Sequence, residues 1–440
     1  MRKSGFSLLS LVAGVCLLPA AAFAQEAPPP PPPPAPAPAP APAPGAVAPA
    51  AVPAAAADHA PAEAPPPPAE ASPPAPPPPA PAEAAPAAPT YPQTTIGGGI
   101  EGSWSRILGA PHPGDTVAPT RAYDSSNGFT LNQASLMVKH QLNETIYGVI
   151  RFDAGSNAAV NNFTSGTGKQ QLFDVREAYA VAQGSGFVFT AGKFATYEGI
   201  EVIDGWLNPT ITRGYLYYLA EPVTHVGAKL HYTTPMFDIG AGVVNGWDTN
   251  NGIFYTGDNN PMKTVLWRLA ATPSPMFWAA FSGAYGVEKP GADSDPRLSL
   301  DLTGAVTPIP QLAINFQGNY GSEKNSHISK PGDAGKWVGF GLQPVVKVDA
   351  YQLGLRFEYF SDDGLSRTAS FVNPTDATTG LPSNTNDKIS LWTLGIAPGY
   401  TVANALLLRA EFRVDGADKE VLWNGKKTQT SLTLAASYFF

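Results

Sequence analysis

The stretch "YQLGLRFEYF", residues 351–360, alternates strictly between two kinds of side chain. One parity is wholly apolar and consists of Tyr351, Leu353, Leu355, Phe357 and Tyr359, whereas the other consists of Gln352, Gly354, Arg356 and Glu358. Successive side chains of a β-strand point to opposite faces, so this stretch predicts a strand with one apolar and one charged face. The stretches "QLAINFQGNY" (311–320) and "ALLLRAEFRV" (405–414) show the same alternation.

Aromatic residues stand at both ends of the apolar face. Tyr351 and Tyr359 are eight steps apart, which is about 26 Å along a strand and about 20 Å across a membrane when the strand is tilted by ~40°. This span is close to the apolar band of ~25 Å, flanked by two aromatic girdles, of an outer-membrane barrel. A soluble β-sandwich would place aromatic residues in the middle of its strands as readily as at their ends. We therefore expect the apolar faces to contact lipid and the charged faces to line a lumen.

From Thr94 onward the sequence contains sixteen candidate strands, separated by clusters of Gly, Asn, Asp and Pro. They lie near 94–105, 127–140, 145–155, 171–183, 186–195, 223–233, 236–246, 263–273, 276–287, 297–307, 311–321, 336–348, 350–361, 387–398, 404–414 and 428–440. Their connections alternate between tight turns, such as "QLNE" (141–144), and long polar stretches, such as 362–386. This pattern predicts an all-β fold, a transmembrane antiparallel up-and-down β-barrel of about 16 strands.

Two strands fit this pattern less well. In "DVREAYAV" (174–181), Glu177 shares a parity with Val175 and Tyr179, which would point a carboxylate at lipid. A β-bulge, or a position near the membrane interface, would resolve the conflict. The stretch "FVFTAGKF" (187–194) does not select either parity clearly.

Residues 1–24 have the pattern of a secretory signal peptide. Arg2 and Lys3 precede an apolar run that ends in Ala22-Phe23-Ala24, which predicts cleavage before Gln25. A retained anchor helix and a lipoprotein site at Cys16 are the alternatives, and the cleavage pattern favours the signal peptide. After this cleavage the chain would contain no cysteine, so no disulfide would stabilise it.

Residues 25–92 are dominated by Pro and Ala and lack the apolar pattern that a core requires. We expect a disordered, extended linker in the periplasm, which precedes a barrel at residues 93–440. A solvated spacer is the simpler interpretation of the linker. The alternative is a periplasmic tether, or a ligand for another envelope protein.

Net charge argues against a nucleic-acid partner. Two of the 27 basic residues and five of the 35 acidic residues precede Thr94, so the domain after it carries a net charge of about −5. A nucleic-acid-binding domain would have a basic face instead.

No motif for catalysis, a cofactor or a metal is apparent. The stretch "GGGIEG" (97–102) lies on a strand with no helix after it, so it does not fit a dinucleotide loop. His225 and His231 are better explained as lumen or rim residues than as metal ligands. The loop at 248–260 could bind calcium, but Asp, Asn and Gly clusters are common in turns. We expect no enzyme activity, no cofactor and no metal site.

The connection at 196–222 is unusual because it combines large apolar residues with charged ones. Such a loop is expected to pack on the protein, and the barrel interior is the nearest surface. Its acids would then oppose arginines of the wall and narrow the pore. An extracellular cap or a subunit contact is the alternative. The candidate pore-lining or constriction residues are Arg151, Asp153, Arg176, Glu198, Glu201, Asp204, Arg213, Arg268, Arg356, Glu358, Arg409, Glu411 and Arg413.

Several stretches resemble the OmpL-like β-barrel porins of Gram-negative bacteria. They are "GKFATYEG" (192–199), "LNP" (207–209), "TRGYLYYLAEPVTHVGAKL" (212–230) and "VVNGWD" (243–248). The resemblance runs from about Thr94 to the C-terminus and implies an outer-membrane pore for small solutes, without indicating which solute. The terminal "YFF" resembles the signal that porin C-terminal strands present to the barrel-assembly machinery, which would assign that role to Tyr438 and Phe440.

The sequence as a whole predicts an outer-membrane porin that conducts small hydrophilic solutes or ions through a charged lumen. Outer-membrane lipid would surround the barrel, as a monomer or a homotrimer. One alternative is a structural envelope protein with a plugged barrel and a Pro-rich tether. A second alternative is an outer-membrane lipase, but no Ser/His pair is placed near the membrane rim as that activity requires. Net acidity favours cations and the wall arginines favour anions, so ion selectivity stays open.

Overall fold

The computed structural model describes residues 90–108, 128–161, 173–248, 260–291, 293–372, 386–422 and 425–440. The predicted signal peptide, nearly all of the Pro/Ala-rich linker and most of the loop at 248–260 lie outside these residues. None of the helices in the described parts of the chain is long and apolar enough to cross a membrane.

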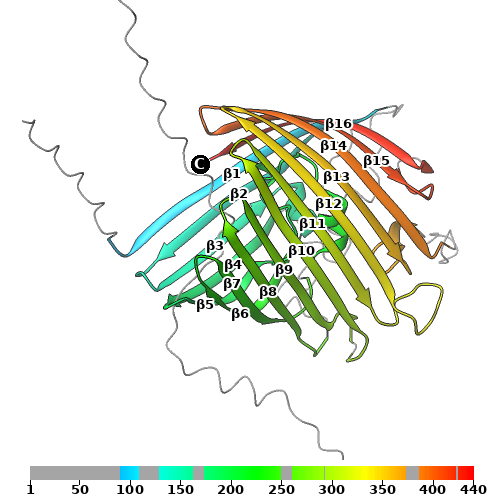
Figure 1. The fold of residues 1–440 in the computed structure, drawn as a ribbon, viewed down its shortest axis with the longest axis horizontal. Helices are drawn as coiled ribbons and strands as arrows, with labels where there is room; N and C mark the ends of the chain where they lie inside the picture. Colours follow the sequence, from blue (N-terminus) through cyan, green and yellow to red (C-terminus); the bar gives the residue numbers. More distant parts are fainter. Residues whose placement is uncertain are drawn as a thin grey trace, which may run out of the picture. The chain divides into compact units, whose positions relative to one another are not determined.

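Sixteen strands form one closed antiparallel barrel, in which each strand pairs with its neighbours in sequence (Figure 1). The strands are β1 (Gln93–Ile107), β2 (Gly128–Gln141), β3 (Ile146–Ala154), β4 (Phe173–Gly184), β5 (Phe187–Ala195), β6 (Thr224–Thr233), β7 (Phe237–Val244), β8 (Thr264–Ser274), β9 (Phe277–Val287), β10 (Pro296–Ile309), β11 (Leu312–Glu323), β12 (Gly335–Val348), β13 (Tyr351–Asp363), β14 (Lys388–Val402), β15 (Leu406–Ala417) and β16 (Thr428–Phe439). Short helical pieces interrupt the long connections: α2 (Ser156–Asn161), the 3₁₀ turn η2 (Gly205–Leu207), the π-helical turn η3 (Leu216–Ala220) and α3 (Ala369–Val372).

The predicted fold class is confirmed, and the observed strand ends lie within four residues of the predicted ones. The alternation of connection lengths is also present. The turns after the even-numbered strands β2 to β14 are short, and the connections after the odd-numbered strands are longer. In the two-residue turn after β4, Ser185 and Gly186 both have positive φ, as a type I′ hairpin turn requires.

The two faces of the barrel wall differ as the alternation predicts. On β13, Tyr351 is 66% exposed, whereas Arg356 and Glu358 are 2% and 1% exposed. The outward apolar face ends in aromatic rings at the short-turn end, where the tilted rings of Tyr351 and Tyr400 have centroids 4.8 Å apart. The inward parity carries the buried charged and polar side chains, so the lumen face of the wall is polar.

The position of Glu177 is resolved by a β-bulge. The register between β3 and β4 shifts at this point, because Arg151 pairs with Glu177 whereas the next residue, Phe152, pairs with Val175. Arg176 is the extra residue. Glu177 therefore lies on the lumen side, where Arg151 Nε approaches its carboxylate at 3.4 Å, and Val175 lies on the lipid side. The bulge was one of the two predicted solutions.

The barrel closes between its first and last strands. β1 pairs with β16 from Gly99–Phe439 to Ile107–Ser431, and the C-terminus lies beside β1 (Figure 1). The terminal residue itself extends this ladder, because the amide of Phe440 donates to the carbonyl of Gly98 at 3.1 Å and its own carbonyl accepts from the Gly98 amide. The Phe440 side chain is 59% exposed on the lipid-facing parity.

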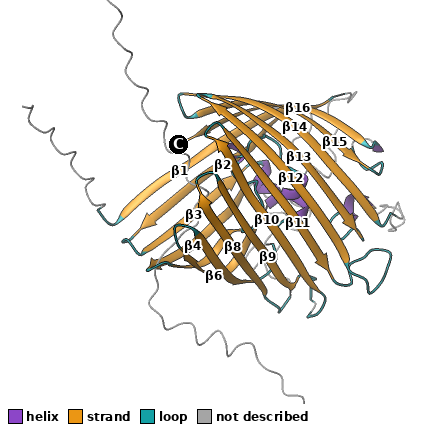
Figure 2. Ribbon diagram, in the orientation of Figure 1, coloured by secondary structure: helices purple, strands orange, loops and turns teal. Residues whose placement is uncertain are grey.

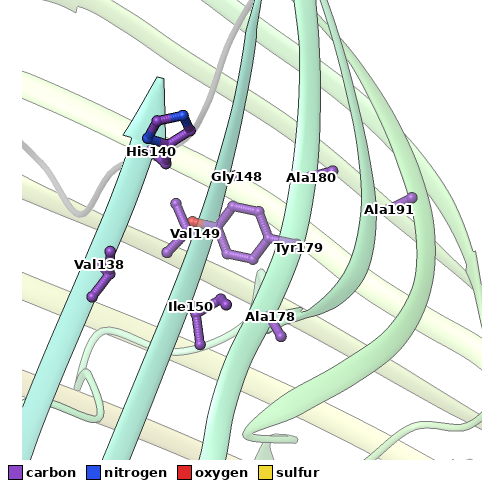
Figure 3. Close-up of a pocket in the computed structure, with 9 residues that line it drawn as sticks. All are labelled: Val138, His140, Gly148, Val149, Ile150, Ala178, Tyr179, Ala180 and Ala191. Atoms are coloured by element: carbon purple, nitrogen blue, oxygen red, sulfur yellow. The ribbon is translucent and has the colours of Figure 1, made fainter. Parts of the chain in front are cut away.

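One groove of about 450 Å³ lies on the outer wall across β2 to β5 (Figure 3). Small outward residues, Gly148, Ala178, Ala180 and Ala191, create it between the larger Val138 and Ile150. Because these residues have the lipid-facing parity, the groove lies outside the lumen. It is not part of a solute path.

The lipid-facing position of Phe440 predicts an assembly defect for Phe440→Ser. The substitution removes about 1.5–3 kcal/mol of apolar transfer free energy at the strand that closes the barrel. We expect a severalfold lower folded fraction, measured as the species that changes its gel mobility on heating. Phe439→Ser is the control, since Phe439 has the opposite parity. Equal folded yields for the two variants would contradict this role of Phe440.

Candidate pore constriction

The connection between β5 and β6, Thr196–Val223, folds into the barrel; we call it the inner segment. Its η3 turn lies inside the barrel against β11, β12 and β13 (Figure 2). Contacts of the inner segment reach β1, β2, β3, β4, β6, β8, β10, β11, β12, β13 and β15. The segment therefore crosses the lumen, and of the three predicted placements the structure has the one inside the barrel.

Asp204 anchors the middle of the inner segment to the wall formed by β2, β3 and β4. Its carboxylate accepts hydrogen bonds from Arg151 at 2.7 Å, from Arg176 at 2.6 Å and from Gln133 at 3.0 Å. Burial by itself would raise the pKa of Asp204, but the guanidinium groups of Arg176 and Arg151 hold it below its usual value. Arg176 also binds Asp153 of β3 at 3.0 Å. The Asp204 carboxylate therefore stays ionised over the physiological pH range.

Arg356 on β13 is the centre of a second anchor. One guanidinium nitrogen donates to Glu201 at 2.8 Å and to the Thr210 side chain and the Thr212 carbonyl. The other approaches Glu411 of β15 at 3.4 Å. Glu411 in turn accepts from the backbone amides of Ile211 and Thr212, both at 2.7 Å. A wall carboxylate thus replaces the backbone partner that this irregular segment lacks.

Two further arginines of β15 hold the same part of the inner segment. Arg409 donates to the carbonyls of Asn208 and Gly205, and pairs with Glu101 of β1 at 2.7 Å. Arg413 donates to the Arg213 carbonyl at 2.6 Å and pairs with Asp415 of its own strand. These side chains act mainly as donors to the carbonyl groups of the segment.

Glu358 of β13 binds the start of η3. Its carboxylate accepts from the amides of Tyr215 at 2.5 Å and of Leu216 at 3.3 Å. The approach depends on Gly214, since a Cβ there would lie 2.0 Å from the Glu358 carboxylate. The neighbouring Gly214 amide donates to Glu201 at 2.8 Å.

Apolar packing fixes the remainder of η3. Tyr215, Leu216 and Leu219 are at most 2% exposed and belong to one cluster with inward side chains of the wall. The wall members include Val244, Leu266, Trp337, Phe360, Ile389 and Leu391, from β7, β8, β12, β13 and β14. Burial of each apolar side chain of this size stabilises the folded state by about 1.5–3 kcal/mol. This explains why a connection with so many large apolar residues folds inward.

The two ends of the inner segment make different contacts. Near the first, Tyr197 shares a hydrogen bond of 2.5 Å with His231 Nε2, and His231 Nδ1 bonds Asp238 at 3.0 Å. Next to it, Glu198 accepts from Ser299 of β10 at 2.5 Å. At the other end, Glu221 accepts from Gln317 of β11 at 2.7 Å.

The predicted residues therefore have several locations. Arg151, Arg176, Asp153 and Asp204 form the first anchor, and Glu201, Arg356, Glu358, Arg409, Glu411 and Arg413 belong to the second. Arg213 donates within the segment, to the Ile203 carbonyl. Arg268 donates to the Tyr197 carbonyl rather than to an acid of the segment, and Glu198 binds a serine rather than an arginine.

Sequence reasoning missed several residues of this site, among them Glu101, Asp301, Glu221 and Gln343. Three of them lie on the inward parity of strands, and the lone Asp301 in the alternating "LSLDLT" (298–303) was the clearest signal. Glu221 lies within the connection itself. What the sequence could not provide is the register that places strands so distant in sequence around one segment.

The chemistry of this region is binding and electrostatics. No group of three or more His, Cys, Asp or Glu side chains within the described ranges has an arrangement that could hold a metal ion. His225 bonds Thr196 and the Gly246 carbonyl, and His231 bonds Tyr197 and Asp238. Both histidines thus have ordinary hydrogen-bond partners.

Comparisons with known proteins agree with a pore. The sequence profile of the family described as "Putative beta-barrel porin-2, OmpL-like" matches residues 93–440. The outer membrane channel DcaP of Acinetobacter baumannii has a similar fold at 13% identity, with a TM-score of 0.53 over 79% of this chain and 97% of that one. A similar fold occurs in the anion-selective porin from Comamonas acidovorans, at 9% identity, with a TM-score of 0.52 over 79% of this chain and 99% of that one. It also occurs in OmpF of Salmonella typhi in complex with daunomycin, at 11% identity, with a TM-score of 0.51 over 79% of this chain and 98% of that one. No curated protein matches this sequence.

The contacts of Arg356 predict a loosened segment in Arg356→Met. Removing this cation leaves Glu201 and Glu411 buried without it, which should weaken docking of the inner segment by about 3–5 kcal/mol. We expect faster amide hydrogen exchange in peptides that contain Ile211 and Thr212. The matched control is Arg297→Met, because Arg297 is also an inward arginine but pairs with Glu323 of β11 at 3.0 Å. Equal exchange in the two variants would show that Arg356 does not hold the segment.

Proposed function

The chain belongs to this OmpL-like β-barrel porin family, and from that premise we propose that small hydrophilic solutes or ions diffuse passively through its lumen past the inner segment. It is an outer-membrane porin by family and by fold. The observation that carries the proposal is a polar lumen with an internal segment bound to its wall. In this proposal the segment forms the narrowest section of the barrel and leaves a path for solutes beside it.

The region around Arg151 is the best candidate for the solute path. Most charged side chains that hold the segment are almost fully buried, with 0% exposure for Glu411 and Arg413. Arg151 keeps 23% of its side-chain surface accessible, and Glu177 and Asp204 keep 12% each. Solutes would therefore contact this group, at β3 and β4, rather than the buried anchor on β13 and β15.

Mixed charge at this position supports weak ion selectivity. Arg151 and the half-buried Lys139 oppose Glu177 and Asp204, so neither sign dominates locally. We propose a pore that admits both ions, with a preference set by the wider lumen. Reversal potentials in a salt gradient measure that preference, and strong selectivity of either sign would contradict the mixed group as its determinant.

Other roles follow as parts of the same proposal. Tyr438 and Phe440 would present the assembly signal to the barrel-assembly machinery, and the Pro/Ala-rich linker would extend into the periplasm, with or without a partner there. Association into a homotrimer belongs to the same proposal. We propose a channel without enzyme activity, cofactor or nucleic-acid partner.

Replacing residues 200–219 by a short Gly/Ser linker tests whether the inner segment limits the pore. We expect a severalfold higher single-channel conductance in planar bilayers, because the polar lumen would then be free of the segment. Folding is checked by the heat-dependent change of gel mobility. A folded variant with unchanged conductance would mean that the narrowest section lies elsewhere.

The second candidate function is that of a structural envelope protein, in which the barrel is plugged and the linker acts as a periplasmic tether. It is favoured by the many wall contacts of the inner segment. Deleting residues 26–89 separates the two, because a porin should keep its conductance whereas a tether should lose its effect on envelope integrity. An absence of conductance above background in the full chain would refute the pore.

A further inference from the structure

Both ends of the inner segment place a carboxylate against the same part of the wall. Glu198 follows β5 and accepts from Ser299 of β10, whereas Glu221 precedes β6 and accepts from Gln317 of β11. The shared partner is Asp301 of β10, whose carboxylate accepts from the Gly199 amide at 3.0 Å. Gln317 donates from one nitrogen to Glu221 at 2.7 Å and to Asp301 at 2.8 Å, so two of the carboxylates lie within reach of a single amide group.

This acidic group has few compensating charges. The neighbours on β10 and β11 are the neutral side chains of Ser299, Gln317 and Asn319. On β8, Arg268 is a cation that acts on Asp301, but it is also engaged with Asp238 and with the Tyr197 carbonyl. Glu201 adds a further negative charge, which Arg356 of β13 neutralises.

The Glu198 side chain is buried and only half satisfied. It is 4% exposed, and its Oε1 accepts from Ser299, while its Oε2 has no hydrogen-bond partner. An ionised carboxylate in that position would leave a desolvated negative charge, which is costly. A protonated carboxyl group avoids this cost, because it is neutral.

Backbone geometry holds the acidic groups together. Gly199 has a φ of +93°, and a Cβ at this position would lie 2.2 Å from the Glu221 carboxylate. The glycine therefore allows the two ends of the segment to cross in contact. Burial raises the pKa of Glu198 to about 8, with Asp301 adding to the effect, and burial likewise raises the pKa of Glu221 well above its usual value.

We propose that protons hold both ends of the inner segment against β10 and β11, and that deprotonation of Glu198 and Glu221 beside Asp301 releases them and widens the pore. The inference rests on the proposed porin function. Asp204 binds Arg176 at 2.6 Å and Glu201 binds Arg356 at 2.8 Å, so these contacts keep the middle of the segment bound while its ends move. The device makes pore width depend on the pH of the medium.

The direction of the pH effect follows from linkage. Groups whose pKa is higher in the docked than in the released state favour docking most below the pKa of the released carboxyl groups. That contribution declines as the pH rises and is exhausted above the docked pKa, at about 8 for Glu198. Conductance should therefore increase as the pH rises from 5 through the docked pKa of Glu198.

Single-channel conductance of the full chain in planar bilayers, measured from pH 5 to pH 10, tests the proposal. We expect at least a twofold rise in the wild type. The double variant Glu198→Gln and Glu221→Gln should stay at its low-pH conductance throughout, because glutamine mimics the neutral carboxyl group. The control is Glu144→Gln in the exposed turn after β2, which should keep the wild-type rise.

Ser299→Ala is a second variant, for which the direction of the shift in the pH midpoint is predicted. It removes the hydrogen bond that stabilises ionised Glu198, so the midpoint of the conductance rise should move to higher pH. Trp247 Nε1 also loses this acceptor, at 3.0 Å, so the folded fraction is checked by gel mobility. A shift to lower pH would count against the proposal.

Three outcomes would overturn the inference. They are a wild-type conductance independent of pH, an unchanged pH response in the double glutamine variant, and a response set by added Ca²⁺ rather than by pH. A complete absence of conductance at every pH would instead refute the porin function. The two failures are therefore distinguishable.

Discussion

Backbone hydrogen bonding in lipid is the constraint on which the remaining structure depends. No water is available there for unpaired amide and carbonyl groups, so the sheet has to close on itself. The ladder that closes the barrel extends to Phe440, which pairs with Gly98. Once the ring is closed, the period of two assigns every wall residue to lipid or to lumen. The charged side chains of the wall thereby meet inside the barrel, where the inner segment needs them.

In the inner segment, backbone groups bond mainly to side chains of the wall, whereas in a strand they bond to the backbone of the neighbouring strands. Apart from its short helical turns it has no ladder of its own, so its amides and carbonyls bond to acidic and basic side chains of the wall. Glu411 and Glu358 accept from its amides, and Arg409 and Arg413 donate to its carbonyls. Wall residues that sequence reasoning treats as charges facing a pore are, for the most part, ligands of this backbone. Both their burial and their pairing result from the need of the segment's backbone for hydrogen-bond partners.

The architecture was largely predictable from the sequence because alternation is local. In a strand such as 351–360, ten residues are enough to assign the apolar and the polar face. Glu177 had the parity of the apolar face, and this conflict indicated the bulge that the structure contains. The inner segment was predicted only as one of three placements, since its composition indicates burial but not the burying surface. The pairs Arg356–Glu201 and Arg409–Glu101 depend on strands brought together by closure. Such distant contacts leave no periodic trace in one sequence.

The separation along the chain between the inner segment and its ligands determines when the segment can settle. Glu411 is 200 residues later than Ile211, whose amide it accepts, and Glu358 is 143 residues later than Tyr215. Until β13 and β15 have joined the sheet, the segment has none of these partners, and long-range contacts of this kind form late because loop closure precedes them. The inner segment therefore completes its contacts with the wall only after β13 and β15 have joined the barrel.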